Sequence, residues 1–556
     1  MAMNIANRLQ TLKAERDNAE GSAPHVIVDA LAGTGKTFTL VMGVGRAVLP
    51  DRTLIKGAGF HFKASAEQGK IWRALAEEGF RTVNYIAFNR SIVEEFKVKW
   101  AWLAESLGRR DVSLGFSTCH QLGFRSVCKA YNLNWRNINQ WKTRNLLENH
   151  LDQDIREVFK ERPVYVQAVE ELVRLCKVNL VEAEPEDLEA LSAHYDVDLG
   201  ADRSEIFETV PVVLEKARTE LNEIDFEDQI WLPVVNDLPV HKTDLLLVDE
   251  GQDLNRCQQE LAMKAGRRIV LVGDVNQAIY GFAGADVDSI PRMAKFLGET
   301  NRGVITIPLT VTRRCGKAIV REANQEVPEF KAHSSNGEGL VRETTDVAMR
   351  EELKNSDMIL CRVNAPLLGT AFQLLREGKR ANIQGRDIGT GLKNLIKKSR
   401  RKTVDDFLDW LEDYYSTEAQ RLNKRKNPSE TALVALKDKV ECLRVFCEGA
   451  LSLKDVRKNI DSLFKGKECP KCKKSFDETQ STCKECEVDL IRPEGVLLSS
   501  IHRSKGLEAP RVFLLHPELV PHPMAKSDWA VRQEYNLRYV AKTRAIAELI
   551  YVRCEK

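Results

Sequence analysis

Short runs of aliphatic and β-branched residues, each ending in small or polar residues, recur along this chain. Such elements cover residues 26–28, 82–88, 115–120, 244–248, 268–273, 358–362 and 495–500, with helical patterns between most of them. Apolar runs without alternation are typical of strands that are buried on both faces of a parallel sheet. We therefore predict an α/β protein whose parallel sheets are flanked by helices.

The first strand leads into a turn of small residues, and a helix is expected from Lys36. Gly33 and Gly35 permit positive φ and close approach, so the backbone amides can converge on an anion at the helix N-terminus. Lys36 can offer an ammonium to β- and γ-phosphates, and Thr37 a hydroxyl to Mg²⁺. The turn therefore predicts a site for a nucleoside triphosphate.

Two later strands end in polar side chains that suit the same site. Asp249 and Glu250 follow an apolar strand, and Gln277 follows the next one. Polar residues at the carboxyl ends of parallel strands meet at one edge of a sheet. Asp249 suits a Mg²⁺ ligand, Glu250 suits the group that orients and deprotonates water, and Gln277 could sense a γ-phosphate.

A second surface is expected beside the nucleotide. Its candidates are Phe88, Asn89, Thr118 and His120, and the alternative for them is helix caps and a satisfied histidine. Tyr280 and Phe282 lie among glycines, which suits exposed rings that stack on bases.

The pattern between about residues 131 and 222 is helical and carries no catalytic signature. Leu146, Leu147, Val169, Leu172 and Leu175 mark its apolar positions. We interpret the stretch as a helical insertion. We expect its aromatic residues, including Trp135 and Trp141, to be core rather than a platform for bases.

Composition narrows the choice of partners only a little. The 556 residues are 43% hydrophobic and 29% charged, and the net charge is +2, so nucleic-acid binding does not follow from bulk charge. No apolar run is long enough to cross a bilayer and the first 20 residues are polar, so we expect a cytoplasmic protein without a signal peptide. Nine of the 13 cysteines lie singly in the sequence and should be buried in a reducing compartment.

Four cysteines are grouped as C-x2-C-x10-C-x2-C, at Cys469, Cys472, Cys483 and Cys486. Two such knuckles can hold one tetrahedral Zn²⁺ with four thiolates and leave no position open for chemistry. An iron–sulfur centre or a redox pair is the alternative. A basic run at 397–402 precedes the knuckles and is either a solvated face or part of a DNA path.

Taken together, these blocks resemble the UvrD/Rep/PcrA-type superfamily-one DNA helicases. The resemblance rests on blocks in the family's order at residues 32–37, 87–90, 118–121, 249–253, 273–280, 313–315, 500–508 and 539–545. It implies two RecA-like motor domains that bind ATP and Mg²⁺ and act on single-stranded DNA. The expected division is 1–125 with 223–303 for the first motor, 126–222 for its insertion, 304–392 with 493–556 for the second motor, and 393–492 for an insertion with the zinc knuckle.

The resemblance also assigns residue roles. Arg314 and Arg544 resemble arginine fingers, Glu508 a ribose contact, His502 and Lys505 DNA contacts, and Phe282 a base-stacking ring. The nucleotide-binding set is Ala32, Gly33, Thr34, Gly35, Lys36, Thr37, Phe38, Asp249, Arg313 and Glu508. The chain departs from the family at Phe38, Arg313 and Ala283, and Gln10 lies too far upstream to be the adenine-reading glutamine.

Three functions are consistent with these features. The first is a translocase that moves 3′ to 5′ on single-stranded DNA and unwinds duplex at single/double-strand junctions. The second is an ATP-dependent remodeller that strips proteins from DNA. The third is an ATP-gated adaptor for a partner nuclease or for a replication, repair or defence protein, which would supply any cleavage.

Overall fold

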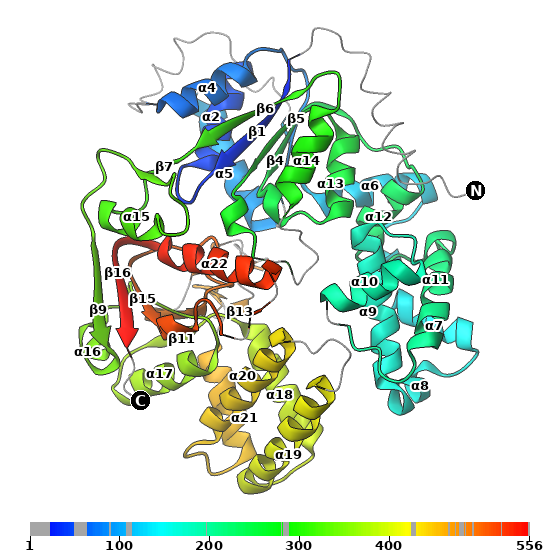
Figure 1. Ribbon diagram of the computed structural model, residues 1–556, viewed down its shortest axis with the longest axis vertical. Helices are drawn as coiled ribbons and strands as arrows, with labels where there is room; N and C mark the ends of the chain where they lie inside the picture. Colours follow the sequence, from blue (N-terminus) through cyan, green and yellow to red (C-terminus); the bar gives the residue numbers. More distant parts are fainter. Residues whose placement is uncertain are drawn as a thin grey trace. The chain divides into compact units, whose positions relative to one another are not determined.

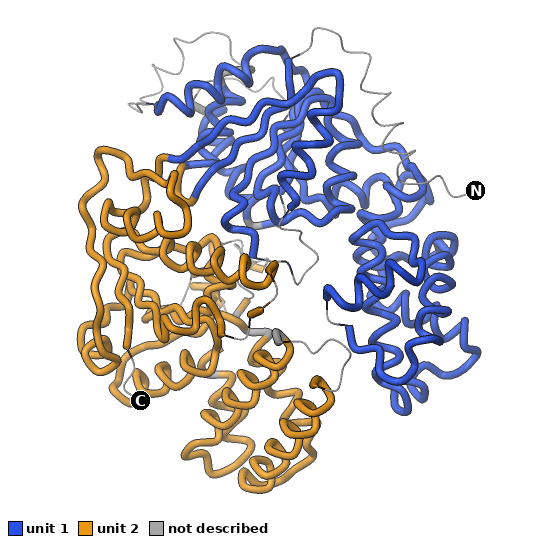
Figure 2. Tube along the Cα trace, in the orientation of Figure 1, with its two compact units in different colours: residues 1–31, 35–310 blue, residues 32–34, 311–556 orange. Residues whose placement is uncertain are grey.

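The computed structural model divides the chain into two compact units, which Figure 2 distinguishes by colour. Unit 1 comprises residues 1–31 and 35–310, and unit 2 comprises 32–34 and 311–556. The structure describes residues 23–48, 64–87, 90–106, 114–195, 197–279, 281, 288–423, 430–464, 467–472, 474–476, 483, 485–486, 488–491, 494–523, 525–526 and 528–553.

Unit 1 is built on a six-stranded sheet in which every pairing is parallel (Figure 1). In spatial order the strands are β3 (Leu114–Thr118), β2 (Val83–Ala87), β4 (Thr243–Asp249), β5 (Gly266–Gly273), β1 (His25–Ala30) and β6 (Val304–Leu309). Val26 and Val28 enter one hydrophobic core and Ile27 enters another, so β1 is buried on both faces. That is why its sequence shows no polar alternation.

Helices cover both faces of this sheet. The flanking helices are α2 (Lys36–Val48), α4 (Ala66–Leu75) and α5 (Arg90–Ser106) against one core, and α6 (Cys119–Tyr131), α13 (Arg256–Ala265) and α14 (Ser289–Gly298) against the other. The second core continues without a break into the helical stretch, whose Leu147 and Leu172 belong to it.

The helical stretch forms as predicted. It contains the 3₁₀ turn η1 (Trp135–Asn137) and α7 (Lys142–Leu151), α8 (Ile155–Glu161), α9 (Pro163–Asn179), α10 (Pro185–Tyr195) and α11 (Arg203–Thr219), and α12 (Asp228–Val235) follows it. Its apolar positions Leu146, Leu147, Val169, Leu172 and Leu175 are buried. The expectation for its tryptophans is wrong, because Trp135 is 69% exposed and Trp141 is 49% exposed.

Unit 2 carries a second parallel six-stranded sheet. Its order is β11 (Ala381–Ile383), β14 (Val496–Ser500), β10 (Met358–Cys361), β15 (Ala509–Leu515), β16 (Ala545–Arg553) and β9 (Leu340–Thr345). Its helices are α15 (Lys317–Ala323), α16 (Asp346–Glu352), α17 (Ala365–Arg376), α18 (Arg386–Ser399), α19 (Val404–Asn423), α20 (Glu430–Cys447), α21 (Leu453–Leu463) and α22 (Asp528–Lys542). Two short pairs complete it, β7 (Val311–Thr312) with β8 (Lys331–Ala332) and β12 (Lys467–Glu468) with β13 (Ser475–Phe476).

The predicted α/β class with parallel sheets is thus confirmed, while one expected border is wrong. We expected the second motor domain to start at residue 304, but β6 pairs with β1 along its whole length and unit 1 runs to Thr310. The sheet to which an edge strand belongs depends on the strand that it pairs with in space, and the sequence does not show that pairing. The expected borders after residues 125 and 392 fall inside α6 and α18, so continuous helices cross both of them.

The isolated cysteines that the structure describes are buried as expected, except Cys128, which is half-buried. Cys176, Cys257 and Cys361 are fully buried, whereas Cys554 lies outside the described residues. Among the helices that the structure describes, none is both long enough and apolar enough to span a membrane.

Candidate functional site

The glycine-rich turn between β1 and α2 has the geometry that its sequence requires. Gly33 and Gly35 have φ of 64° and 82°, a region that side chains with a Cβ rarely adopt. Two side chains of α4 hold the first turn of α2 in place. Trp72 Nε1 donates to the Thr39 carbonyl at 2.9 Å, and Gln68 Nε2 donates to Thr39 Oγ1 at 3.0 Å. A rigid helix N-terminus of this kind can bind an anion through its amides.

The two carboxylates after β4 have different surroundings. Asp249 is buried and accepts hydrogen bonds from Tyr85 Oη at 2.7 Å and from the Glu250 amide at 2.9 Å. Glu250 has φ of 51°, an uncommon left-handed conformation for a residue with a side chain. Its carboxylate lies 3.0 Å from Lys36 Nζ. The fold therefore brings Lys36, Asp249 and Glu250 together, as the sequence predicted.

The end of β5 adds a third acidic group. Asp274 is buried and accepts a hydrogen bond from Gln277 Nε2 at 2.6 Å. Gln252 bridges the two strand ends, because its side-chain oxygen accepts the Asp274 amide at 3.0 Å and its amide group donates to Glu250. Gln277 thus lies in the same network as Glu250.

Burial and mutual charge set the protonation of this cluster. Burial by itself lowers the pKa of Lys36, but Glu250, Asp274 and Asp249 outweigh it and raise that pKa overall. Burial, and then the nearby Glu250, raises the pKa of Asp249 to about 6, and burial raises the pKa of Asp274 to about 6. Excess negative charge around one lysine suits a site that will receive a metal cation.

In unit 2, three sequence-predicted residues from separate blocks lie together. Arg314 Nε lies 2.6 Å from a Glu508 carboxylate oxygen, and Arg314 Nη1 donates to the Thr543 carbonyl at 3.4 Å. Arg544 is 1% exposed and donates to the carbonyls of Val540 and Leu507 at 3.0 and 3.2 Å. Arg313 is exposed.

The described candidates for the second surface of unit 1 have structural partners. Thr118 Oγ1 accepts the Gln121 amide at 3.2 Å and caps α6. The register places Thr118 beside Ala87, which lies between Thr118 and Asp249 at one edge of the sheet. His120 stacks on Phe226, with ring centroids 3.9 Å apart, and burial lowers the pKa of His120 to about 4. Phe226 is 54% exposed, so much of its side chain remains accessible to solvent.

The unit 2 candidates follow its strand ends. His502 comes just after β14, and burial together with Arg362 and Arg503 lowers the pKa of His502 to about 3, so the imidazole is neutral at physiological pH. Lys505 is half-buried and follows three residues later. Phe88, Asn89, Tyr280, Phe282, Ala283 and Gln10 lie outside the described residues.

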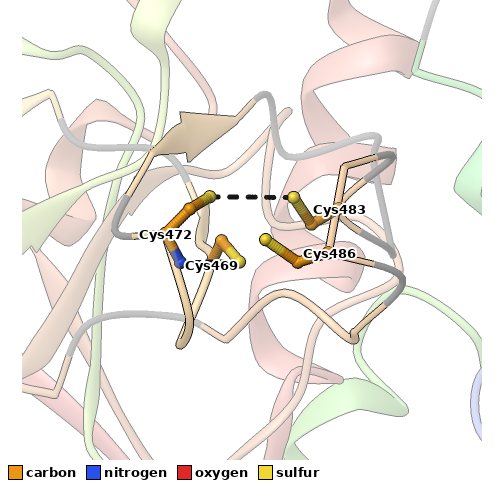
Figure 3. Close-up of side chains that lie close together, drawn as sticks. All are labelled: Cys469, Cys472, Cys483 and Cys486. Atoms are coloured by element: carbon orange, nitrogen blue, oxygen red, sulfur yellow. Dashed lines mark hydrogen bonds between the residues drawn. The ribbon is translucent and has the colours of Figure 1, made fainter.

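The four grouped cysteines form a compact cluster (Figure 3). Their sulfur atoms all lie within 4.8 Å of one another, and Cys472 Sγ lies 3.8 Å from Cys483 Sγ. Sulfurs about 2.3 Å from a central Zn²⁺ in a tetrahedron would be roughly 3.8 Å apart, far beyond a disulfide bond. Each knuckle is closed by a backbone hydrogen bond of the same kind: the Cys469 amide donates to the Lys474 carbonyl at 3.0 Å, and the Cys483 amide donates to the Val488 carbonyl at 2.8 Å. The donor set fits Zn²⁺.

Sequence reasoning missed several residues of these sites. Tyr85, Gln68 and Gln252 orient the predicted groups, and Phe226 covers His120. Gln252 lies inside the recognised 249–253 block, so its position was a usable signal. Tyr85 and Phe226 gave no such signal in the sequence, because an aromatic residue in a strand or loop can equally well be part of the hydrophobic core.

The structure has two parallel sheets, and at the carboxyl edge of the first a strand leads through a glycine-rich turn into a helix. This arrangement defines a P-loop protein with two RecA-like domains. Residues 12–297 match the UvrD/REP helicase N-terminal domain, and residues 369–556 match the UvrD-like helicase C-terminal domain. The chain belongs to the UvrD/REP helicase family, as its motifs suggested.

Curated relatives are similar at low identity. The F-box DNA helicase protein 1 of Schizosaccharomyces pombe is 25% identical over 56% of this chain and 34% of its own length. The ATP-dependent DNA helicases PcrA of Staphylococcus aureus and Bacillus subtilis are 24% and 25% identical, over 63% and 60% of this chain and 61% and 59% of their own lengths. The chain therefore spans between a third and three-fifths of these relatives.

Proposed function

We propose that this protein is an ATP-driven motor that moves on single-stranded DNA, from 3′ to 5′, and separates the duplex ahead of it. The observation that carries the proposal is the cluster at the carboxyl edge of the first sheet, where Lys36 lies 3.0 Å from Glu250 and next to buried Asp249 and Asp274. Membership of a helicase family and relatives named ATP-dependent DNA helicases support the same activity.

In this proposal, the triphosphate binds at the turn between β1 and α2. The phosphate-binding turn consists of Ala32, Gly33, Thr34, Gly35, Lys36 and Thr37, with Phe38 following. Thr37 and Asp249 would hold Mg²⁺, which neutralises phosphate charge when bound. Glu250 orients and deprotonates the attacking water, and its carboxylate lies 3.0 Å from Lys36 Nζ. Gln277, held by Asp274, senses the γ-phosphate.

Unit 2 supplies cations and a nucleoside contact in the same proposal. Arg314 and Arg544 act as arginine fingers, which stabilise the charge that develops on the γ-phosphate. Glu508 contacts the ribose, and Arg313 stacks on the purine. The close approach of Arg314 and Glu508 supports a shared site for both.

Single-stranded DNA and its junctions with duplex are the proposed substrate. Its contacts are Phe88, Asn89, Thr118, His120, Tyr280, Phe282, His502 and Lys505, to which the exposed ring of Phe226 is now added. The four cysteines hold a structural Zn²⁺. We retain the proposed division into two motors and two insertions, with the second motor starting at residue 311.

The decisive experiment measures ATP hydrolysis with single-stranded DNA, duplex DNA and RNA in turn. Glu250→Gln should lower kcat by about 100-fold or more, since it removes the proposed base, while nucleotide binding persists. Lys36→Ala should abolish hydrolysis, and both variants should still bind single-stranded DNA. Lys70→Ala on α4 and Glu77→Gln just after that helix, both at exposed positions, are matched controls. Parent-like turnover in both active-site variants would refute the assignment.

Two alternatives predict different assays. A remodeller would displace a DNA-bound protein but leave a duplex with a 3′ tail intact. An ATP-gated adaptor for a partner nuclease would bind ATP but turn over less than about once per minute at saturating DNA, against about 10 per second for an ordinary enzyme. The hydrolytic arrangement of Lys36 and Glu250 argues against a site used for binding alone.

A further inference from the structure

The helical insertion of unit 1 exposes apolar rings where its sequence predicts a core. Trp135 and Trp141 are 69% and 49% exposed, and Ile138 between them is 41% exposed. Each tryptophan has an arginine over its ring, Arg136 at 5.4 Å and Arg144 at 4.8 Å from the ring centroid. Exposed tryptophan is costly to keep in water, so a segment that displays two of them within seven residues calls for a binding partner.

This segment is held rigidly rather than loosely. Asn134 caps η1, and the Trp141 amide donates to Asn139 Oδ1 at 2.9 Å. Residue 138 forms a parallel bridge with Ile224, in which the Ile224 amide donates to Asn137 at 2.9 Å and the Asn139 amide donates to Ile224 at 2.8 Å. Rigid aromatic side chains lose little conformational entropy when a ligand stacks on them.

The same backbone pairing joins this segment to the Phe226 ring. Phe226 lies two residues beyond Ile224 and stacks on His120 at the edge of the first sheet. A buried ion-pair cluster holds the residues next to Trp141 and Phe226 in place. Lys142, next to Trp141, donates to Asp228 at 2.8 Å. Lys177 contacts Asp225 and Asp228, which lie on either side of Phe226 in the sequence. The segment that carries the exposed tryptophans is therefore held against the segment that carries Phe226.

Charge within the stretch that carries the tryptophans has one sign, although the Glu223 carboxylate of the neighbouring segment accepts hydrogen bonds from Asn139 at 2.7 Å and Asn145 at 3.2 Å. Residues 112–147 contain no aspartate or glutamate but five lysines and arginines. Lys142 is buried in its ion pair and Arg144 is neutralised by Glu170 at 2.7 Å, which leaves Arg125, Lys129 and Arg136 exposed. No ion pair involves these three among the described residues. Arg125 and Lys129 are one helical turn apart on α6, which leads from His120 towards Trp135.

We propose that Trp135 and Trp141, with Arg125, Lys129 and Arg136, form a second single-stranded nucleic-acid platform on the helical insertion, continuous with the His120–Phe226 pair. Bases stack on the indole rings, and the cations contact the phosphates. The inference rests on the proposed function, because the strand must already pass His120. It extends the length of strand that the protein covers.

The test is binding of fluorescein-labelled oligothymidylates of roughly 10 and roughly 30 nucleotides, followed by anisotropy at equilibrium. The double variant W135A/W141A should weaken binding of the long strand by about 10-fold or more, since stacking on each ring contributes substantially, and leave the short strand within about twofold. kcat at saturating DNA should stay at the parent value. Trp102→Ala, which removes a 53% exposed tryptophan from α5, is the matched control.

A second variant guards against a folding defect. W135F/W141F keeps a ring at each position and should recover most of the affinity for the long strand, with a melting temperature equal to that of the parent. R125E/K129E should weaken binding of the long strand and reduce its salt dependence.

The outcomes separate the two levels of the argument. If the parent protein binds no single-stranded DNA and shows no DNA-stimulated hydrolysis, the proposed function fails. If the parent binds and hydrolyses but W135A/W141A binds the long strand as tightly as the parent, only the platform is wrong, and the tryptophans then form a protein-binding surface.

Discussion

Asp249 and Glu250 are adjacent in the sequence, yet the structure gives them opposite surroundings. Asp249 ends a strand and is buried under Tyr85, whereas Glu250 turns into the left-handed region and reaches Lys36. Strained conformations of this kind persist where the surroundings hold them, often at functional sites. The sequence predicted the pair, but only the fold shows which oxygen atoms remain available and which are engaged.

The raised pKa of Asp249 gives a test through pH. Because that pKa is about 6, a proton competes with Mg²⁺ as pH falls through about 6, so hydrolysis at limiting Mg²⁺ should be lost there. Excess Mg²⁺ should move the acid limb to lower pH. Tyr85→Phe removes a hydrogen bond that lowers the Asp249 pKa, so its limb should move to higher pH.

The measurement is kcat/KM for ATP against pH at two Mg²⁺ concentrations, with the parent and Tyr85→Phe compared. Tyr131→Phe, at a half-buried position on α6 outside this cluster, is the control. An acid limb that ignores both Mg²⁺ concentration and the Tyr85 hydroxyl would contradict the role of Asp249.

At the scale of elements, apolar runs located the strands well. Residues 26–28, 244–248 and 268–273 all fall in buried strands, because a strand covered on both faces has no polar positions to confuse the pattern. The helical stretch was equally clear. The apolar runs did not predict which element each one packs against. The strand from Val304 pairs with β1, and Trp135 and Trp141 face solvent.

The sequence also did not predict the buried charged side chains of the helical insertion. Lys142 and Asp228 are both 0% exposed, and the pKa of Lys177 is raised because Asp225 and Asp228 outweigh its burial. A lysine on an amphipathic helix normally reads as surface. Here the ammonium groups tie α7 and α9 to the segment that begins α12.

Removing one cation from this cluster should therefore be costly. Lys142→Met leaves Asp228 with a single buried partner and should destabilise unit 1 by about 3–5 kcal/mol. Urea unfolding followed by circular dichroism measures the change, with Lys160→Met at an exposed position of α8 as control. A loss no larger than that of the control would show that the pair adds nothing to the stability of the folded insertion.

At the scale of the whole molecule, the cysteine knuckles are a separate small folding unit. Cys469, Cys483 and Leu490 form a cluster of their own, apart from the large core that unites the second sheet with α17 to α21. So few apolar residues cannot hold a fold without a metal or another staple. Zinc should thus matter to this region and little to the sheets.

Metal removal tests that independence. The purified protein should contain about one zinc per chain. A strong chelator should release it and make residues 467–491 sensitive to protease, while the circular dichroism of the sheets and ATP binding persist. Cys486→Ser should lower the zinc content, and Cys128→Ser, outside the cluster, should not. Full zinc content in Cys486→Ser would contradict the assignment.

The order of the motifs and the class of fold were determined by the sequence alone, because glycine, lysine, carboxylate and cysteine spacing specify local chemistry that needs no distant partner. Tertiary structure decided the rest: the pairing of β6, the burial of Lys142 and Asp228, the meeting of Arg314 with Glu508, and the exposure of Trp135 and Trp141. These features depend on which distant segments pack together. The hydrophobic pattern of a sequence indicates that one face of an element is apolar, but it does not indicate which segment covers that face.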